Sequence, residues 1–349
     1  MTVAPSLVPE PRFRINRHRW LAWIGSGLAC LLSLVGLVLC WLHPSIRSPL
    51  KPGLDFTGGT QIQVVRACDS LAASSGNNSG NNSGNNIGNN SGSGANLPCP
   101  AISAPQIQQE LTRIQLKAEG SDQLPNLGST NVQVLDKGRS VVLRLPALSP
   151  DQASAVLDDL NQRIGPLQKT GSSIDTIGPT LGSRLLQGSL ISLLVSFAGI
   201  AAYISFRYSG VYAFLALVCL AHDVLITCGL FAWLGLLRGI EVDSLFAVSL
   251  ITVAGYSVTD TVVVFDRIRE QRKALAQLPV VDQVDVAVDA TLTRSLYTSL
   301  TTLLPLLALI FFGGSSLFWF SIALAVGIGV GSWSSIGIAP TLLPLLARR

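Results

Sequence analysis

Six long apolar segments constrain the fold of this chain more than any other feature of its sequence. The first covers residues 20–42 and contains no charged residue, and about 20 apolar residues are enough to cross the hydrocarbon core of a bilayer. Five further segments meet this length: 185–206, 211–236, 244–265, 290–312 and 318–346. The sequence therefore predicts a polytopic α-helical membrane protein with six transmembrane helices.

The composition argues against most classes of soluble protein. Of the 349 residues, 48% are hydrophobic and only 13% are charged, and the mean hydropathy is +0.48. That charged share is about half of what a soluble domain carries. The net charge of +4 is small, and the positive residues gather near the ends of apolar segments. This clustering is typical of membrane orientation, and we expect neither a soluble enzyme nor nucleic-acid binding.

The first apolar segment begins as a signal peptide does, because four arginines lie in the basic tail of residues 1–19. A signal peptide has an apolar core of only about 7–15 residues and ends at a small-residue cleavage site. Here the segment is longer and ends in Trp41-Leu42-His43-Pro44. We therefore expect residues 20–42 to be a retained first transmembrane helix. The last segment contains Pro340 and Pro344, and we expect its end to kink or to lie near the interface.

Positive residues near the spans predict the orientation of the chain. With six spans, the opposite short loops carry only Arg238, and one side of the membrane holds the other basic groups near the spans: Arg12, Arg14, Arg17, Arg19, Arg207, Arg267, Arg269, Arg272, Lys273, Arg348 and Arg349. We expect both termini in the cytoplasm and residues 43–184 in the periplasm. The membrane would be the cytoplasmic (inner) membrane, or a thylakoid membrane in a host that has one.

The polar segment 43–184 has the pattern of a small α+β domain. Alternating apolar residues predict strands at 60–66, 131–135, 141–145 and 169–177, and helical spacing predicts helices at 105–117 and 149–164. The sequence Asp136-Lys137-Gly138-Arg139 is typical of a hairpin turn. The order β-α-β-β-α-β predicts a ferredoxin-like external domain that needs no cofactor.

An insertion rich in Asn, Gly and Ser interrupts this domain at 74–96. Such a tract buries too little apolar surface to offset its ordering entropy, so we predict disorder in preference to an Asn-rich recognition arm. Cys68 and Cys99 bracket the insertion on the oxidising side. A disulfide and two free thiols fit the sequence equally well, because the distance between their Cα atoms is not given by it. No Cys-x-x-Cys pair points to a metal site.

Three charged residues lie where lipid should exclude them: Asp223, Asp260 and Arg294. A charge at the bilayer centre costs at least about 2.5–3.5 kcal/mol, so such residues are paired, protonated or in contact with water. Asp260 lies six residues before Asp266 at the cytoplasmic boundary, about 9 Å deep at 1.5 Å per residue. Arg294 enters from the same side on the next helix. We expect the two to meet, unless the Arg294 side chain extends to the interface.

This pair would suit a proton carrier. Removal from water favours a protonated carboxyl, while a nearby guanidinium favours the ionised form. Movement of Arg294 relative to Asp260 would therefore change the proton affinity of the site, although a static ion pair is the alternative. His222 and Asp223 form a second candidate relay, or a structural hydrogen-bonded pair.

Several motifs resemble the SecF branch of the SecD/SecF family of protein-translocase subunits. The sequence GLDFTGGT at 53–60 resembles its Asp-Phe-Thr-Gly-Gly signature, and GYSVTDTVVVFDRIRE at 255–270 is similar to a long and specific stretch of the family. Three shorter matches are Ile177-Gly178-Pro179, His222-Asp223-Val224 and Thr293-Arg294-Ser295-Leu296. The motif residues that we single out are Asp55, Gly58, Gly59, Gly255 and Tyr256.

The resemblance implies half of an RND-type architecture, paired with a similar six-span SecD. It also implies association with the SecYEG channel, SecA and YidC, and use of the proton-motive force to export unfolded preproteins. The family's transmembrane Asp and Arg fall on Asp260 and Arg294. We interpret Asp55 as a structural residue of a Gly-rich turn. No catalytic residue, cofactor or metal is implied.

Two other functions are weighed against this one. A small-molecule efflux half-transporter would share the architecture but would usually have a larger external portion. An intramembrane aspartyl protease could use Asp223 and Asp260, but the Gly-x-Gly-Asp pattern is missing and Arg294 would disturb a shared proton. The sequence has no ATP-binding Gly-x-x-x-x-Gly-Lys-Ser/Thr motif. The choice between proton and sodium, and the stoichiometry, are left open.

Overall fold

The computed structural model describes residues 11–66, 102–114, 127, 130–135, 140–164 and 167–346. The chain divides into two compact units, a helical unit of Met1–Gly53 with Leu186–Arg349 and an α+β unit of Leu54–Leu185. The predicted insertion at 74–96, Cys68, Cys99 and the turn at 136–139 lie outside the described residues.

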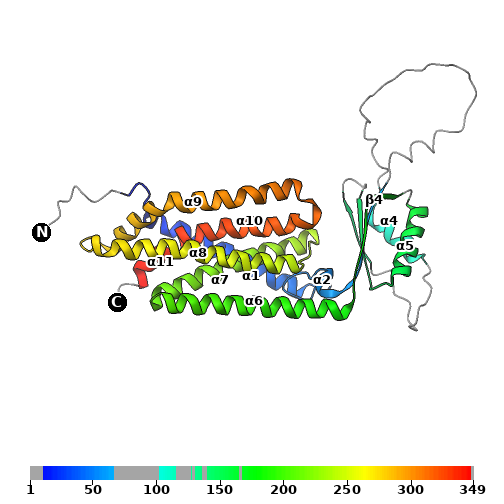
Figure 1. The fold of residues 1–349 in the computed structure, drawn as a ribbon, viewed down its shortest axis with the longest axis horizontal. Coiled ribbons are helices and arrows are strands. Elements are labelled where there is room, and N and C mark those ends of the chain that lie inside the picture. Colours follow the sequence, from blue (N-terminus) through cyan, green and yellow to red (C-terminus); the bar gives the residue numbers. More distant parts are fainter. Residues whose placement is uncertain are drawn as a thin grey trace, which may run out of the picture. The chain divides into compact units, whose positions relative to one another are not determined.

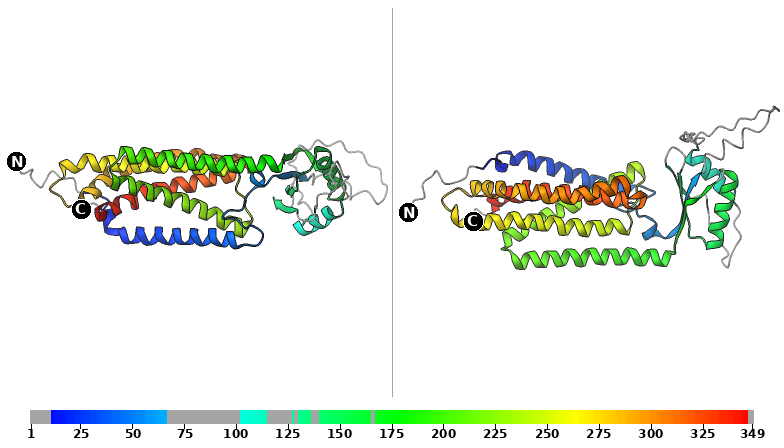
Figure 2. Two further views of the ribbon diagram at one scale, coloured as in Figure 1. Left: turned by 90° about the horizontal axis from the view of Figure 1, so that it is seen from below. Right: turned by 45° about the horizontal axis from the view of Figure 1, so that its top comes forward.

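Six helical segments in the described part of the chain are long and apolar enough to cross a membrane, which confirms the predicted number. The helices are α1 (Arg19–Leu42), α6 (Pro179–Arg207), α7 (Gly210–Arg238), α8 (Ser244–Ala274), α9 (Val280–Phe312) and α10 (Gly314–Gly337), with α11 (Ala339–Leu346) continuing the last segment. A short 3-10 helix, η2 (Ile15–His18), precedes α1. Figures 1 and 2 show that α8, α9 and α10 run alongside one another.

The helix ends differ from the apolar segments for physical reasons. Helix α8 continues to Ala274 and α9 already begins at Val280, because polar turns extend these helices beyond the apolar part that hydropathy detects. The last segment is broken at Ile338, between α10 and α11. Pro340 is the second residue of α11, and a proline in the first turn of a helix loses no hydrogen bond that the helix needs.

Two glycines allow close helix crossings in the bundle. A Cβ added to Gly229 on α7 would lie 2.2 Å from Cβ of Ser33 on α1, and one added to Gly327 on α10 would lie 2.2 Å from Cγ2 of Val253 on α8. Small residues at such crossings let helix backbones approach, which favours association within a membrane. Helix α8 packs against α7, α9 and α10, and this arrangement brings residues of four helices together.

The α+β unit has the ferredoxin-like arrangement that the sequence predicts. A short helix α2 (Leu54–Thr57) leads into β1 (Gly59–Arg66), and the remaining elements are α4 (Ala104–Thr112), β2 (Asn131–Leu135), β3 (Ser140–Leu145), α5 (Pro150–Arg163) and β4 (Leu167–Ile177). The sheet order is β2-β3-β1-β4, and each neighbouring pair is antiparallel. In register, Thr60 of β1 lies opposite Leu145 of β3 and Thr176 of β4.

One apolar core holds this unit together. Ile62 and Val64 of β1, Leu143 of β3 and Leu160 of α5 are all fully buried in it. Both helices begin with a capping box, and that of α5 starts at Ser149, whose Oγ accepts the N–H of Gln152. Alternation along the strands and helical spacing along α5 thus direct the apolar side chains of both into one shared core.

Candidate functional site

Asp260 lies in the bundle with hydroxyl groups as its partners. The residue is on α8 and only 7% exposed. Its Oδ1 accepts a hydrogen bond from Ser295 Oγ on α9 at 2.8 Å, and its Oδ2 accepts one from Ser335 Oγ on α10 at 2.5 Å. Each carboxylate oxygen therefore receives one hydroxyl donor, and the two donors come from different helices.

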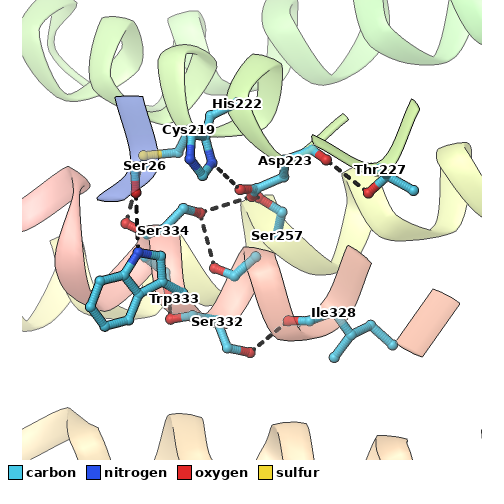
Figure 3. Close-up of polar contacts among 12 residues, drawn as sticks. Ser26, Cys219, His222, Asp223, Thr227, Ser257, Ile328, Ser332, Trp333 and Ser334 are labelled. Atoms are coloured by element: carbon cyan, nitrogen blue, oxygen red, sulfur yellow. Dashed lines mark hydrogen bonds and ion pairs between the residues drawn. The ribbon is translucent and has the colours of Figure 1, made fainter. Parts of the chain in front are cut away.

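Asp223 on α7 is a second buried carboxylate, with no exposed surface. Its Oδ2 accepts hydrogen bonds from Ser257 Oγ on α8 at 2.5 Å and from Ser334 Oγ on α10 at 2.8 Å. Its Oδ1 lies 2.8 Å from Nδ1 of His222. Figure 3 shows these groups converging on the Asp223 carboxylate. The side chain thus joins α7, α8 and α10.

The two carboxylate sites share helices α8 and α10. Ser334 and Ser335 are consecutive residues of α10, and one binds Asp223 while the other binds Asp260. On α8, Ser257 donates to Asp223 and precedes Asp260 by one turn. A displacement of α8 or α10 therefore acts on both sites.

Ser334 and Ser335 of α10 each have a second hydrogen-bond acceptor besides a carboxylate. Ser334 Oγ lies 3.0 Å from the carbonyl oxygen of Gly331, and Ser335 Oγ lies 3.0 Å from that of Ser332. A hydroxyl has one proton to donate and can accept as well. Each serine can therefore donate to an ionised carboxylate, or turn its proton to its own helix and accept one from a protonated carboxyl.

A further polar chain runs from the Asp260 site along α9. Ser299 Oγ on α9 lies 2.5 Å from Ser332 Oγ on α10, and Tyr256 on α8 donates its hydroxyl to Ser299 at 3.2 Å. Sequence reasoning missed these serines. The signal that could have found them is the spacing of Ser295 and Ser299, which places both on one face of α9.

The structure does not bring Arg294 to Asp260. Arg294 is exposed on the surface of the bundle, while the next residue, Ser295, is buried against the carboxylate. Successive helix residues project about 100° apart, so the two side chains leave α9 in different directions. Among the described residues, no lysine or arginine forms an ion pair with Asp260 or Asp223.

Comparison with known proteins agrees with the architecture and the motifs. Residues 156–349, more than half of the chain, match the family described as protein export membrane protein SecD/SecF, C-terminal, and residues 47–65 match the SecD/SecF GG motif. This chain belongs to the SecD/SecF family. The resemblance noted in the sequence is thereby confirmed.

Individual members of the SecD/SecF family extend this result. Protein translocase subunit SecF of Prochlorococcus marinus is 46% identical over 95% of this chain and 95% of its own length, and that of Synechocystis is 39% identical over 92% and 90%. The crystal structure of SecDF, a translocon-associated membrane protein from Thermus thermophilus, superposes with a TM-score of 0.73 at 27% identity. That match covers 97% of this chain and 39% of SecDF, so the chain spans about two fifths of the solved protein.

The GG motif of the family has a clear structural role here. Gly58 and Gly59 have φ of +70° and +135°, a region that disfavours residues with a side chain. A Cβ at Gly58 would lie 2.8 Å from Cα of Pro179, and one at Gly59 would lie 2.7 Å from the carbonyl oxygen of Leu145. The two glycines therefore let the chain pass from α2, which contains Asp55, into β1.

Other predicted site residues are placed as follows. Gly255 is exposed on α8, and a Cβ added to it would meet nothing within 4 Å. Cys30, Cys40, Cys219 and Cys228 are free thiols. Within the residues that the structure describes, no three His, Cys, Asp or Glu side chains group as metal ligands.

Proposed function

We propose that this chain works with a SecD partner to drive preprotein export with the proton-motive force, after the channel and ATPase have acted. The proposal includes both termini in the cytoplasm and residues 43–184 in the periplasm. SecYEG, SecA and YidC are the further partners, and the substrate is an unfolded preprotein. The observation that supports it is the buried Asp260 carboxyl, which has serine hydroxyls as partners on two helices.

These partners suit a group that gains and loses a proton. An ionised carboxylate at the bilayer centre is costly, and no described cation pairs with Asp260 to offset that cost. Ser335 can serve either ionisation state, because the carbonyl of Ser332 is its alternative acceptor. A proton could therefore bind and leave without repacking of side chains, while the change in charge alters how strongly α8 holds α9 and α10.

The exposed face of α8 and α9 supports the proposed partner. Arg294 and Thr298 on α9 and Thr252 and Thr259 on α8 are exposed although they lie within apolar helices. A guanidinium that faces lipid is costly, whereas a neighbouring protein surface can provide a counter-charge. We propose that SecD helices cover this face and that Arg294 acts at the interface between the two subunits.

The decisive experiment compares Asp260→Asn with Asp266→Asn, which makes the same chemical change near the cytoplasmic end of the same helix. Inverted vesicles would contain each variant with SecD, the channel and the ATPase. We expect Asp260→Asn to insert and to copurify with SecD but to lose the stimulation of export by a proton gradient, while Asp266→Asn keeps it. Full stimulation of export by a proton gradient in Asp260→Asn would refute the proposal. If a sodium gradient alone stimulates export by the unmodified chain, sodium and not the proton is the coupling ion.

A further inference from the structure

The His222–Asp223 pair contains a polar atom that the proposed function does not explain. His222 is 9% exposed, and its Nδ1 lies 2.8 Å from Oδ1 of Asp223. Its other ring nitrogen, Nε2, is buried and has no hydrogen-bond partner among the described residues. Buried polar atoms are rarely left without a partner, so this nitrogen calls for a ligand.

A cleft beside His222 provides space for that ligand. The cleft has a volume of about 510 Å³ and lies between α1, α7 and the C-terminal segment, with a lining that includes Trp23, Ser26, Cys30, His222 and Leu342. Water can occupy a space that is large enough and offers polar partners. His222 and Ser26 bring polar side chains to this otherwise largely apolar lining. Nε2 itself is covered by neighbouring atoms, so water in the cleft, and with it a proton, reaches this nitrogen when the side chains that cover it move aside.

Charge balance favours proton uptake by the pair. With one proton shared between the imidazole and the carboxylate, His222 and Asp223 carry a net charge of −1. A second proton on Nε2, taken by the lone pair of that nitrogen, gives a neutral imidazolium–carboxylate pair while the Nδ1 proton stays on the bond to Oδ1. A net charge within the membrane is unfavourable, so the second proton reduces this cost.

The surroundings contain no competing cation in the described residues. The titratable groups that neighbour the pair are the thiol of Cys30 on α1 and that of Cys219 on α7, and Asp260 on α8 is connected to it through Ser334 and Ser335. Helices α10 and α11 contain no titratable side chain within their bounds, Gly314–Gly337 and Ala339–Leu346. The charge of the pair is therefore controlled by its own protonation and by the Asp260 site.

We infer that His222 and Asp223 form a second proton-binding site, with Nε2 as the proton acceptor and the cleft along α1 as the route of exchange. Ser334 and Ser335 link it to Asp260, so a proton bound at one site changes the proton affinity of the other. This inference rests on the proposed function, because the proposed orientation decides to which side of the membrane the site releases its proton. The lining residues of α1 lie in its N-terminal half, which is the cytoplasmic half in the proposed orientation, so this site would release protons to the cytoplasm.

Nitrogen NMR of histidine tests the inference directly, because the chain has only three histidines. In the full chain with SecD in liposomes, His18→Gln and His43→Gln leave His222 as the sole labelled imidazole. We expect its ring signals to change reversibly from the neutral to the doubly protonated form as the sample is taken from about pH 8 to about pH 5. Asp260→Asn should shift the midpoint of this change, and Asp223→Asn should reduce the doubly protonated fraction because it removes the negative partner.

A His222 that keeps neutral-imidazole signals throughout this range would overturn the inference and leave a structural hydrogen-bonded pair. A midpoint unchanged by Asp260→Asn would overturn the proposed link between the two sites. The titration uses the native imidazole, so it does not depend on whether a His222 variant folds. If His222 titrates while Asp260→Asn still shows full proton-stimulated export, the proposed function fails and the proton site stands. If His222 does not titrate but Asp260→Asn abolishes that stimulation, only the further inference fails.

Discussion

Replacing Gly327 with alanine tests how tightly α10 crosses α8. The new Cβ would lie 2.2 Å from Cγ2 and 2.8 Å from Cγ1 of Val253. Carbon atoms in good contact are about 3.5–4.0 Å apart, so the helices must separate locally by about 1 Å. Val253 is fully buried, and its β-branched side chain has little freedom to turn away.

The expected cost follows from this overlap. Forcing an extra methyl group into a packed core typically costs about 1–3 kcal/mol, and each 1–2 kcal/mol changes the ratio of folded to unfolded protein by roughly 5–30-fold. Gly329→Ala is the matched control, because a Cβ at that position of α10 meets nothing within 4 Å. Both substitutions change the backbone entropy of the same helix alike, so their difference isolates the crossing.

Reversible unfolding of the full chain in mixed micelles, followed by circular dichroism, would provide the comparison. We expect Gly327→Ala to unfold at a lower denaturant concentration than Gly329→Ala. Adding Val253→Ala should make the pair of changes less damaging than the sum of the single ones, since the clash is then relieved. Equal stability of the two glycine variants would refute the close crossing.

Two further predictions concern the ends of the helices. Burial, and secondly the 3.1 Å hydrogen bond that Tyr208 donates to Asp266, raise the pKa of Tyr208 to about 12. An unfolded tyrosine has a pKa of about 10. The stability that the protonated Tyr208 contributes is therefore fully present below about pH 10 and is lost as the pH rises through about 12. Alkaline ultraviolet titration should therefore lose one late-ionising tyrosine in Tyr208→Phe, and an unchanged late amplitude would contradict the assignment. Asp285 Oδ1 accepts the backbone N–H of Asn16 at 3.1 Å and its Nδ2 at 2.8 Å, and hydrogen bonds to a charged group are worth about 1.5–3 kcal/mol. Asp285→Ala should therefore speed tryptic cleavage after Arg14 and Arg17, on either side of Asn16, by about tenfold or more. The same change at the exposed Asp282 should not, and equal rates for the two variants would argue against this anchor.

The structure buries Asp260 inside the bundle but gives it other contacts than the sequence predicts. A rise of 1.5 Å per residue predicts a similar level for Asp260 and Arg294, and for this reason the sequence points to Arg294 as the partner. Which face of α9 points to α8 depends on packing that one sequence does not reveal. The structure turns Ser295 inward and Arg294 outward, so the partner differs by a single residue.

The fold followed from patterns that packing does not alter. Six apolar segments of sufficient length predict six spans regardless of how the helices cross, and alternation identifies β1 and β3 because one side of each strand must enter the core. Ends were harder to predict, since polar turns carry no hydropathy signal. Thus α4 ends at Thr112, earlier than expected, and β4 begins at Leu167, two residues before the predicted strand.

The consecutive serines of α10 have a mechanical consequence. Ser334 and Ser335 project in different directions from one helix, yet each binds a carboxylate on a different neighbour, so together they fix the angle of α10 about its own axis. Any turn of α10 must strain both bonds at once. Rotation of α10 should therefore break the Ser334–Asp223 and Ser335–Asp260 hydrogen bonds together, in a single kinetic phase.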